Sequence, residues 1–123
     1  MTKPFQFYIS TSMEKSSVLV ALSALAQETR LDIFRLLIQA GPDGMPAGQI
    51  GERLGLPSAT LAFHLKELKT AGLATVTRNG RSLIYAAAYP TMNGLLAYLM
   101  ENCCGGPTTA AQPSCLPTAT RSC

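Results

Sequence analysis

The dipeptide Asn79-Gly80 narrows the possible folds of this chain more than any other feature. It lies between two β-prone segments, 73–78 and 81–88. Asn-Gly in that setting is the strongest short-range signal for a tight hairpin turn. The chain on either side of the hairpin carries apolar residues at helical spacing instead. We therefore predict a small antiparallel hairpin placed between helices.

Four helices are predicted before the hairpin and one after it. Their approximate spans are 13–27, 29–40, 46–54, 58–71 and 90–104. Thr29 and Asp32 resemble a weak N-cap pair for the second helix. In the last helix Cys103 continues an apolar series with steps of three and four, and the glycines that follow Cys104 are expected to end it.

The helix predicted over residues 58–71, which Gly72 ends, has two distinct faces. One face carries a stripe of leucines that we expect to be buried: Leu61, Leu65 and Leu68. The opposite face is small, aromatic, hydroxylated or basic: Ala59, Ala62, Phe63, Lys66 and Thr70. A short helix, a turn and a helix with such an outer face form a helix-turn-helix pattern.

The predicted fold is mainly α with a small β-hairpin, a winged helix-turn-helix with the order α-α-α-α-β-β-α. We expect three parts: a flexible N-terminal arm (1–12), a DNA-binding and dimerisation domain (13–104), and a flexible Cys-containing tail (105–123). The apolar stripes of the first and last helices exceed what one small domain can cover, which predicts a homodimer.

Basic residues gather on the part of the chain predicted to meet DNA. Half of the ten basic residues lie between positions 53 and 81, and Glu67 is the only acid in that interval. The partner expected from this pattern is operator double-stranded DNA. The candidate DNA-binding residues are Ser58, Thr60, Phe63, His64, Lys66, Lys69, Arg78 and Arg81.

Several of these residues have a second interpretation. Phe63 would contact a thymine methyl group or pack against the protein itself. His64 would be structural or touch a phosphate, and a role as metal ligand is disfavoured. Ser58 would contact a base or only cap its helix. The lysines are expected to meet phosphates. Arg78 and Arg81 flank the hairpin tip, where they would lie near the DNA backbone or minor groove or serve solubility alone.

All four cysteines lie in the last 21 residues: Cys103, Cys104, Cys115 and Cys123. No apolar run is long enough to span a membrane and no signal-peptide core is present, so we expect a cytoplasmic protein with reduced thiols. Cysteines in that setting indicate metal binding or redox chemistry. We find no nucleophile motif, phosphate-binding glycine loop or zinc-finger spacing, which predicts that the protein is not an enzyme.

Two segments carry a family resemblance: LAQETRLDIFRLL at 25–37 and AFHLKELKTAGL at 62–73. They resemble the entry helix and the recognition helix of the ArsR/SmtB metalloregulatory repressors, over about residues 13–102. The resemblance implies a homodimeric transcriptional repressor that leaves its operator when a metal or metalloid ion binds. The chain departs from the family at its sensor positions, since no cysteine lies beside the helix-turn-helix and the last helix has no His. The vicinal pair near the C-terminus is instead similar to the arsenic-responsive branch with C-terminal cysteines.

Soft thiolates select soft ions, and As(III) favours three sulfurs. We therefore predict As(III) as inducer, with Sb(III) or methylated trivalent arsenic possible, held by Cys103, Cys104 and a third thiol from the tail. Cys115 is favoured over Cys123 because it closes a shorter loop. An organoarsenical with two sulfur ligands would need only the vicinal pair.

Three alternatives to ion sensing are open for these thiols. The vicinal pair could pack as small hydrophobic side chains, although the two tail cysteines lie beyond any helix. A thiol-redox repressor of the same fold, responding to peroxide or persulfide, is the main rival. A helix C-terminus disfavours a bare thiolate, which counts against it. An enzyme or a metal carrier using the tail thiols is the third.

Overall fold

Residues 13–105 are described by a computed structural model of the chain. Their elements are α2 (Lys15–Leu25), α3 (Glu28–Ala40), β1 (Met45–Pro46), α4 (Ala47–Leu54), α5 (Ser58–Thr70), β2 (Ala74–Asn79), β3 (Ser82–Ala87), α6 (Tyr89–Leu99) and the 3-10 turn η2 (Cys103–Gly105). This order confirms the predicted winged helix-turn-helix with its small antiparallel sheet. The predicted arm, 1–12, lies outside the described residues, as does nearly all of the predicted tail.

The sheet has three antiparallel strands in the order β1-β3-β2. β2 and β3 form the predicted hairpin, and Asn79 pairs with Ser82 as the last pair before the turn. The turn itself is therefore Gly80 and Arg81, one residue later than the predicted Asn79-Gly80, with Gly80 at φ 68°. The two-residue strand β1, in which Met45 pairs with Tyr85, was not predicted, because so short a segment has no periodicity.

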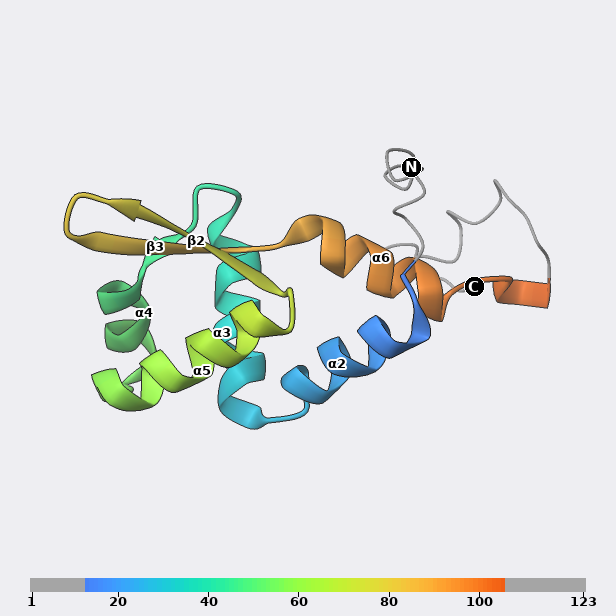
Figure 1. The fold of residues 1–123 in the computed structure, drawn as a ribbon, viewed down its shortest axis with the longest axis horizontal. Coiled ribbons are helices and arrows are strands. Elements are labelled where there is room, and N and C mark those ends of the chain that lie inside the picture. The colour runs from blue at the N-terminus through green and yellow to red at the C-terminus, as the bar shows by residue number, and fades with distance from the viewer. Residues whose placement is uncertain (1–12, 106–123) are drawn as a thin grey trace.

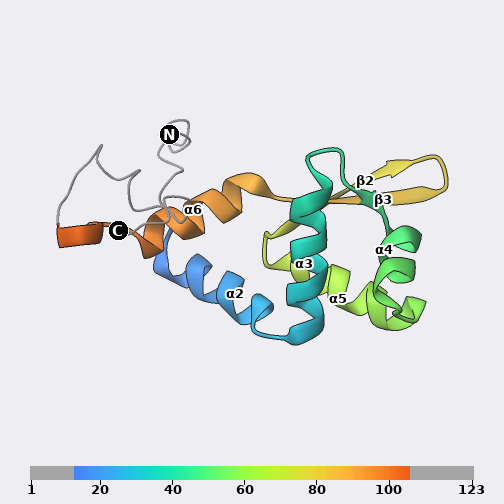
Figure 2. The same ribbon diagram turned by 180° about the vertical axis from the view of Figure 1, so that it is seen from behind.

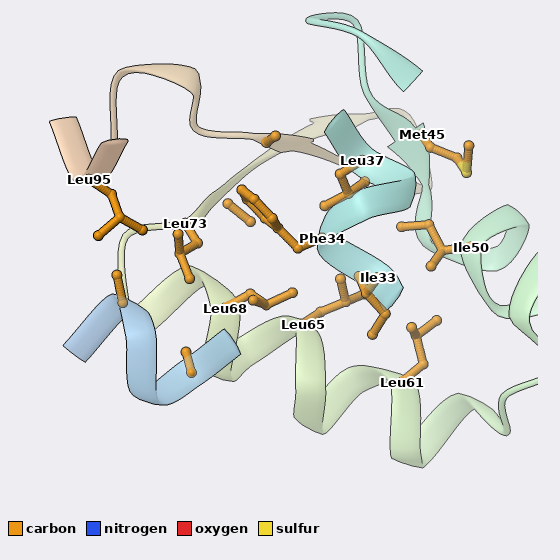
Figure 3. Close-up of a cluster of buried hydrophobic side chains, with 14 of the residues drawn as sticks. Ile33, Phe34, Leu37, Met45, Ile50, Leu61, Leu65, Leu68, Leu73 and Leu95 are labelled. Atoms are coloured by element: carbon orange, nitrogen blue, oxygen red, sulfur yellow. The ribbon is translucent and has the colours of Figure 1, made fainter. Parts of the chain in front are cut away.

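The hydrophobic core lies between α3, α5 and the inner end of the hairpin (Figure 3). Phe34 and Leu37 of α3 pack there with Leu65 and Leu68 of α5, and all four are almost fully buried. The predicted leucine stripe of α5 is confirmed as buried. On α3, Ile33 is fully buried together with Phe34 and Leu37, whereas Leu31 is 42% exposed.

The start of α3 also differs from the prediction. Its N-cap is Gln27 instead of Thr29, and the Gln27 Oε1 atom accepts a hydrogen bond of 2.8 Å from the Arg30 backbone N–H. Gln is not among the preferred N-cap residues, whereas Thr is, so short-range preference favoured the wrong residue. The helix consequently begins at Glu28, whose charge suits the N-terminal end of the helix dipole.

The last helix is shorter than predicted. α6 ends at Leu99, and the chain turns away through Asn102 at φ 59°. Cys103 therefore does not continue the apolar stripe of α6, and the glycines after Cys104 do not end the helix. Asn is one of the few residues that adopt a left-handed conformation at modest cost, so Asn102 was the available signal.

The molecule is elongated, with different elements at its two ends (Figures 1 and 2). The hairpin tip, α4 and the start of α5 lie at one end, while α6 and η2 extend to the other beside α2. A hydrogen bond of 2.9 Å from the Tyr89 hydroxyl to the Ile38 carbonyl fixes the start of α6 against α3. Within residues 13–105, no helix is both long and apolar enough to cross a bilayer.

Candidate nucleic-acid interface and thiol pair

The turn between α4 and α5 sets the angle at which α5 is presented. Gly55 ends α4 in a left-handed conformation, and Leu56 N–H donates a 3.0 Å hydrogen bond back to the Gly51 carbonyl. A Cβ added at Gly51 would lie 3.3 Å from the Leu61 side chain. α4 is therefore in close contact with the first turns of α5 at Gly51 and Leu61.

The first turn of α5 exposes the two predicted base-contacting hydroxyls. Ser58 and Thr60 are both exposed. The N-cap position belongs to Pro57 and has no side-chain hydrogen bond. Ser58 is therefore the first residue of the helix and does not cap it. Of the two roles predicted for Ser58, contact with a base remains.

The predicted basic contacts are all exposed. Lys66 and Lys69 lie on α5, Arg78 lies on β2, and Arg81 is in the hairpin turn. The hairpin tip and the first turns of α5 are at the same end of the molecule in both views (Figures 1 and 2). The exposed basic and hydroxyl groups can therefore approach one extended, negatively charged partner from that end.

Phe63 and His64 occupy different environments although they are neighbours on α5. The Phe63 ring is 54% exposed, whereas His64 is only 9% exposed. Their rings meet edge to face, with centroids 5.2 Å apart and an angle of 64° between the ring planes. An exposed Phe63 ring fits the predicted thymine contact, while burial removes His64 from the exposed group.

His64 has a polar partner that sequence reasoning missed. The Arg30 Nη1 atom lies 3.2 Å from the His64 Nδ1 atom. The Arg30 Nε–H also donates to the Ala24 carbonyl of α2 at 2.7 Å. Of the two roles predicted for His64, the structural one fits this geometry. Arg30 is 34 positions away in sequence, and no local pattern indicates that the two side chains meet.

The vicinal thiols lie in the short segment that follows α6. Cys103 N–H donates to the Met100 carbonyl at 2.9 Å, which folds η2 back on the end of the helix. Cys104 has φ 62°, a left-handed conformation that is uncommon for a residue with a side chain. The two Sγ atoms are 3.3 Å apart; Cys104 is exposed and Cys103 half-buried.

The spacing of the two sulfurs suits a shared ligand. Thiolate–metal bonds are about 2.3 Å long in zinc sites, so one ion can hold sulfurs up to about 4.6 Å apart. The 3.3 Å separation falls within that limit. Among residues 13–105, no three His, Cys, Asp or Glu side chains come together in a group that could hold a metal ion. Both candidates for a third sulfur, Cys115 and Cys123, lie outside the described part of the chain.

Comparison with known proteins places this architecture among transcriptional regulators. Residues 25–77 match a family model described as a helix-turn-helix domain. The chain is 30% identical over 78 residues to the uncharacterized HTH-type transcriptional regulator YceK of Bacillus subtilis strain 168, covering 63% of this chain and 77% of that protein.

Solved structures show the same similarity. An ArsR-like transcriptional regulator from Rhodococcus sp. RHA1 is 27% identical, with a TM-score of 0.61 over 69% of this chain and 77% of that one. HlyU from Vibrio cholerae N16961 is 28% identical, with a TM-score of 0.57 over 71% and 97%. A homodimeric winged helix-turn-helix DNA-binding domain from Mycobacterium bovis, a possible ArsR-family regulator, is 26% identical, with a TM-score of 0.57 over 71% and 81%.

Proposed function

This chain belongs to the ArsR-like winged helix-turn-helix transcriptional regulators, and on that premise we propose that it is a homodimeric repressor released from its operator by trivalent arsenic. Membership of this family makes it a DNA-binding regulator and not an enzyme. The observation that carries the arsenic proposal is the approach of the Cys103 and Cys104 sulfurs to 3.3 Å.

Homodimer formation is supported by the apolar side chains that one protomer leaves exposed. Leu19 and Val20 of α2 are 58% and 51% exposed, and Leu99 of α6 is 56% exposed. α2 and α6 contact each other at the end of the molecule away from the hairpin (Figure 2). The Mycobacterium bovis domain, which shares the fold, is described as homodimeric. A twofold pairing through α2 and α6 would present two α5 helices to successive major grooves.

Thiol chemistry favours a trivalent arsenic species as inducer. Two thiolates from consecutive residues are close enough to bind one soft ion. The third sulfur of an As(III) site would come from Cys115, separated from Cys104 by ten residues. Such a flexible loop closes at modest entropic cost, and a longer loop would be needed for Cys123. Sb(III) has the same ligand preference, whereas a methylated trivalent arsenical with two sulfur ligands needs Cys103 and Cys104 alone.

Binding of the ion would act on DNA through α6. With α6 ending at Leu99, the ion would tie the tail to the segment just after the helix and not to the helix face itself. α6 contacts α2, and η2 follows α6 after three residues, so the ion would bind next to the proposed dimer contact. For release, the ion-bound state must bind the operator more weakly, by a coupling free energy of about 1–3 kcal/mol or more.

A cysteine-to-serine comparison tests this proposal. The Cys103→Ser and Cys104→Ser variants should bind a duplex selected by the wild-type protein with unchanged affinity, yet no longer be released by arsenite. Cys115→Ser and Cys123→Ser should show which tail thiol is needed. Retained release in both Cys103→Ser and Cys104→Ser would contradict the proposal, and so would loss of DNA binding before any ion is added.

The redox alternative makes a different prediction for the same assay. Consecutive Cα atoms are about 3.8 Å apart, which is shorter than the roughly 4.4–6.8 Å found in ordinary disulfides. Direct oxidation of the pair would therefore give a strained bond. Release by peroxide or persulfide, with no response to arsenite under reducing conditions, would identify the redox repressor instead.

A further inference from the structure

We infer that Arg30 is a positioning residue for DNA recognition, which fixes the recognition helix α5 through His64. The inference rests on the proposed function only in taking α5 as the helix that contacts the operator. It does not depend on any inducer. Arg30 lies in the first turn of α3, and its side chain reaches α2 at the Ala24 carbonyl and α5 at His64.

Arg30 is itself held in place by its neighbours along the chain. Its backbone N–H donates to the Gln27 Oε1 atom at 2.8 Å, and its Nε–H donates to the Ala24 carbonyl at 2.7 Å. Ala24 lies in the last turn of α2 and is buried. The guanidinium of Arg30 is therefore fixed relative to α2 by hydrogen bonds that do not involve α5.

The third hydrogen bond determines the state of the imidazole. A guanidinium only donates, so the Arg30 Nη1 atom must be the donor and the His64 Nδ1 atom the acceptor across their 3.2 Å separation. The proton of the neutral ring is then on Nε2. This bond fixes both the tautomer of the His64 ring and its orientation.

The orientation of the His64 ring bears directly on the exposed face of α5. Its edge-to-face contact with the Phe63 ring, at 5.2 Å between centroids, links the buried side of the helix to the side expected to meet bases. Loss of Arg30 would leave the Nδ1 atom of a 9% exposed ring without this partner. A buried polar atom that loses its partner favours movement of the element that carries it.

Apolar packing and the hydrogen bonds of Arg30 act together between α2 and α5. Val18, Ala21 and Ala24 of α2 belong to the same buried core as the leucines of α5 (Figure 3). An open groove lies between the two helices beside Arg30, and Leu19 and Val20 line it together with Ser23, Glu67 and Thr70. Arg30 therefore adds a directional polar link between α2 and α5 to a contact that is otherwise apolar.

A double-mutant cycle on ion-free protein tests the inference. Arg30→Met keeps the length of the side chain and removes its donors, and His64→Leu removes the acceptor. Affinities for the selected duplex and for a scrambled duplex are measured by fluorescence anisotropy, at a temperature where circular dichroism shows each variant folded. Arg35→Met, which removes an exposed charge from the same helix, is the matched control.

Arg30→Met should bind the selected duplex about tenfold more weakly, the size expected for one charge-assisted hydrogen bond. Binding to the scrambled duplex should fall no more than in Arg35→Met, because nonspecific binding depends on the number of exposed positive charges more than on the exact position of α5. Arg30→Met should add no further loss in the His64→Leu background, whereas His64→Asn, which keeps an acceptor near the Nδ1 position, should retain most of the affinity.

Two results would overturn the inference. Arg30→Met could behave as Arg35→Met does, or the losses from Arg30→Met and His64→Leu could multiply in the double variant. If Arg30→Met does not fold, Arg30→Lys replaces it in the cycle, because a single ammonium cannot bridge Ala24 and His64 in the same way. If arsenite does not release the protein from DNA, the proposed inducer is wrong, but the outcome of this double-mutant cycle still stands, because it is measured without any ion.

Discussion

At the scale of single residues, α5 separates side chains that hold the fold from side chains free to meet DNA. Leu65 is 1% exposed in the core, and Phe63, two positions earlier, is 54% exposed. We expect Leu65→Ala to lower the free energy of unfolding by about 2–5 kcal/mol. Phe63→Ala should change it by less than about 1 kcal/mol and instead weaken binding to the selected duplex.

Urea denaturation at a single protein concentration measures the first effect, and anisotropy measures the second. Equal destabilisation by the two substitutions would show that Phe63 packs within the protein and would remove it from the proposed interface. Unchanged DNA affinity in Phe63→Ala would also remove Phe63 from the proposed interface.

The sequence predicted which side of α5 is exposed, but it did not predict that His64 has Arg30 as its partner. Period and residue type predict which side of a helix is buried, and that prediction holds for the three leucines. For His64 the sequence left two roles open, a structural one and contact with a phosphate. Its burial depends on Arg30 of another helix, and a contact between residues so distant in sequence leaves no local pattern.

At the scale of elements, the link between α3 and β1 depends on Gly44. This residue has φ 77°, and a Cβ there would overlap the carbonyl oxygen of Tyr85 on β3. Gly80 also has a positive φ, at 68°, but a Cβ there would meet nothing within 4 Å. We expect Gly80→Ala to cost about 1 kcal/mol for its conformation alone.

Gly44→Ala should cost more than Gly80→Ala, because the added methyl group must also push β1 away from β3. Thermal and urea unfolding of both variants measure the difference. Equal stability of the two variants would mean that β1 moves away from β3 without cost and does not contribute to the sheet.

The elements that sequence predicted poorly are those fixed by contacts outside themselves. Strand β1 exists because Met45 and Pro46 pair with β3, and two residues carry no alternation of their own. The end of α6 was placed too late because the apolar spacing continues to Cys103 although the backbone turns at Asn102. Helix type and the existence of the hairpin were predicted correctly, because they depend on local periodicity. The turn was placed one residue too early, at Asn79-Gly80 instead of Gly80-Arg81.

At the scale of the whole molecule, the exposed leucines of α2 and α6 predict the dimer. Replacing Leu19 and Leu99 together by Glu would place charges in an apolar interface, where each would lack a partner. We expect this variant to sediment as a monomer at concentrations where the wild-type protein is a dimer. Leu83→Glu, on the hairpin at 39% exposure, is the matched control and should remain a dimer.

Analytical ultracentrifugation distinguishes these outcomes. A Leu19→Glu, Leu99→Glu variant that sediments like the wild-type protein would place the dimer contact elsewhere. The sequence predicted this surface from apolar stripes too wide for one small domain, and exposure in the protomer agrees with it. The sequence could not predict that the hairpin and η2 lie at opposite ends of the molecule, because their separation is a property of the folded chain (Figure 1).

The central claim is that a soft ion bound by sulfur just after α6 releases the dimer from DNA. The most direct measurement is a titration of the reduced, ion-free protein bound to a fluorescent selected duplex, with arsenite, antimonite, a methylated trivalent arsenical and Zn(II) in parallel. We predict that a trivalent arsenic species lowers the anisotropy to that of unbound duplex, near one ion per protomer. An anisotropy that no thiophilic ion changes would contradict the claim.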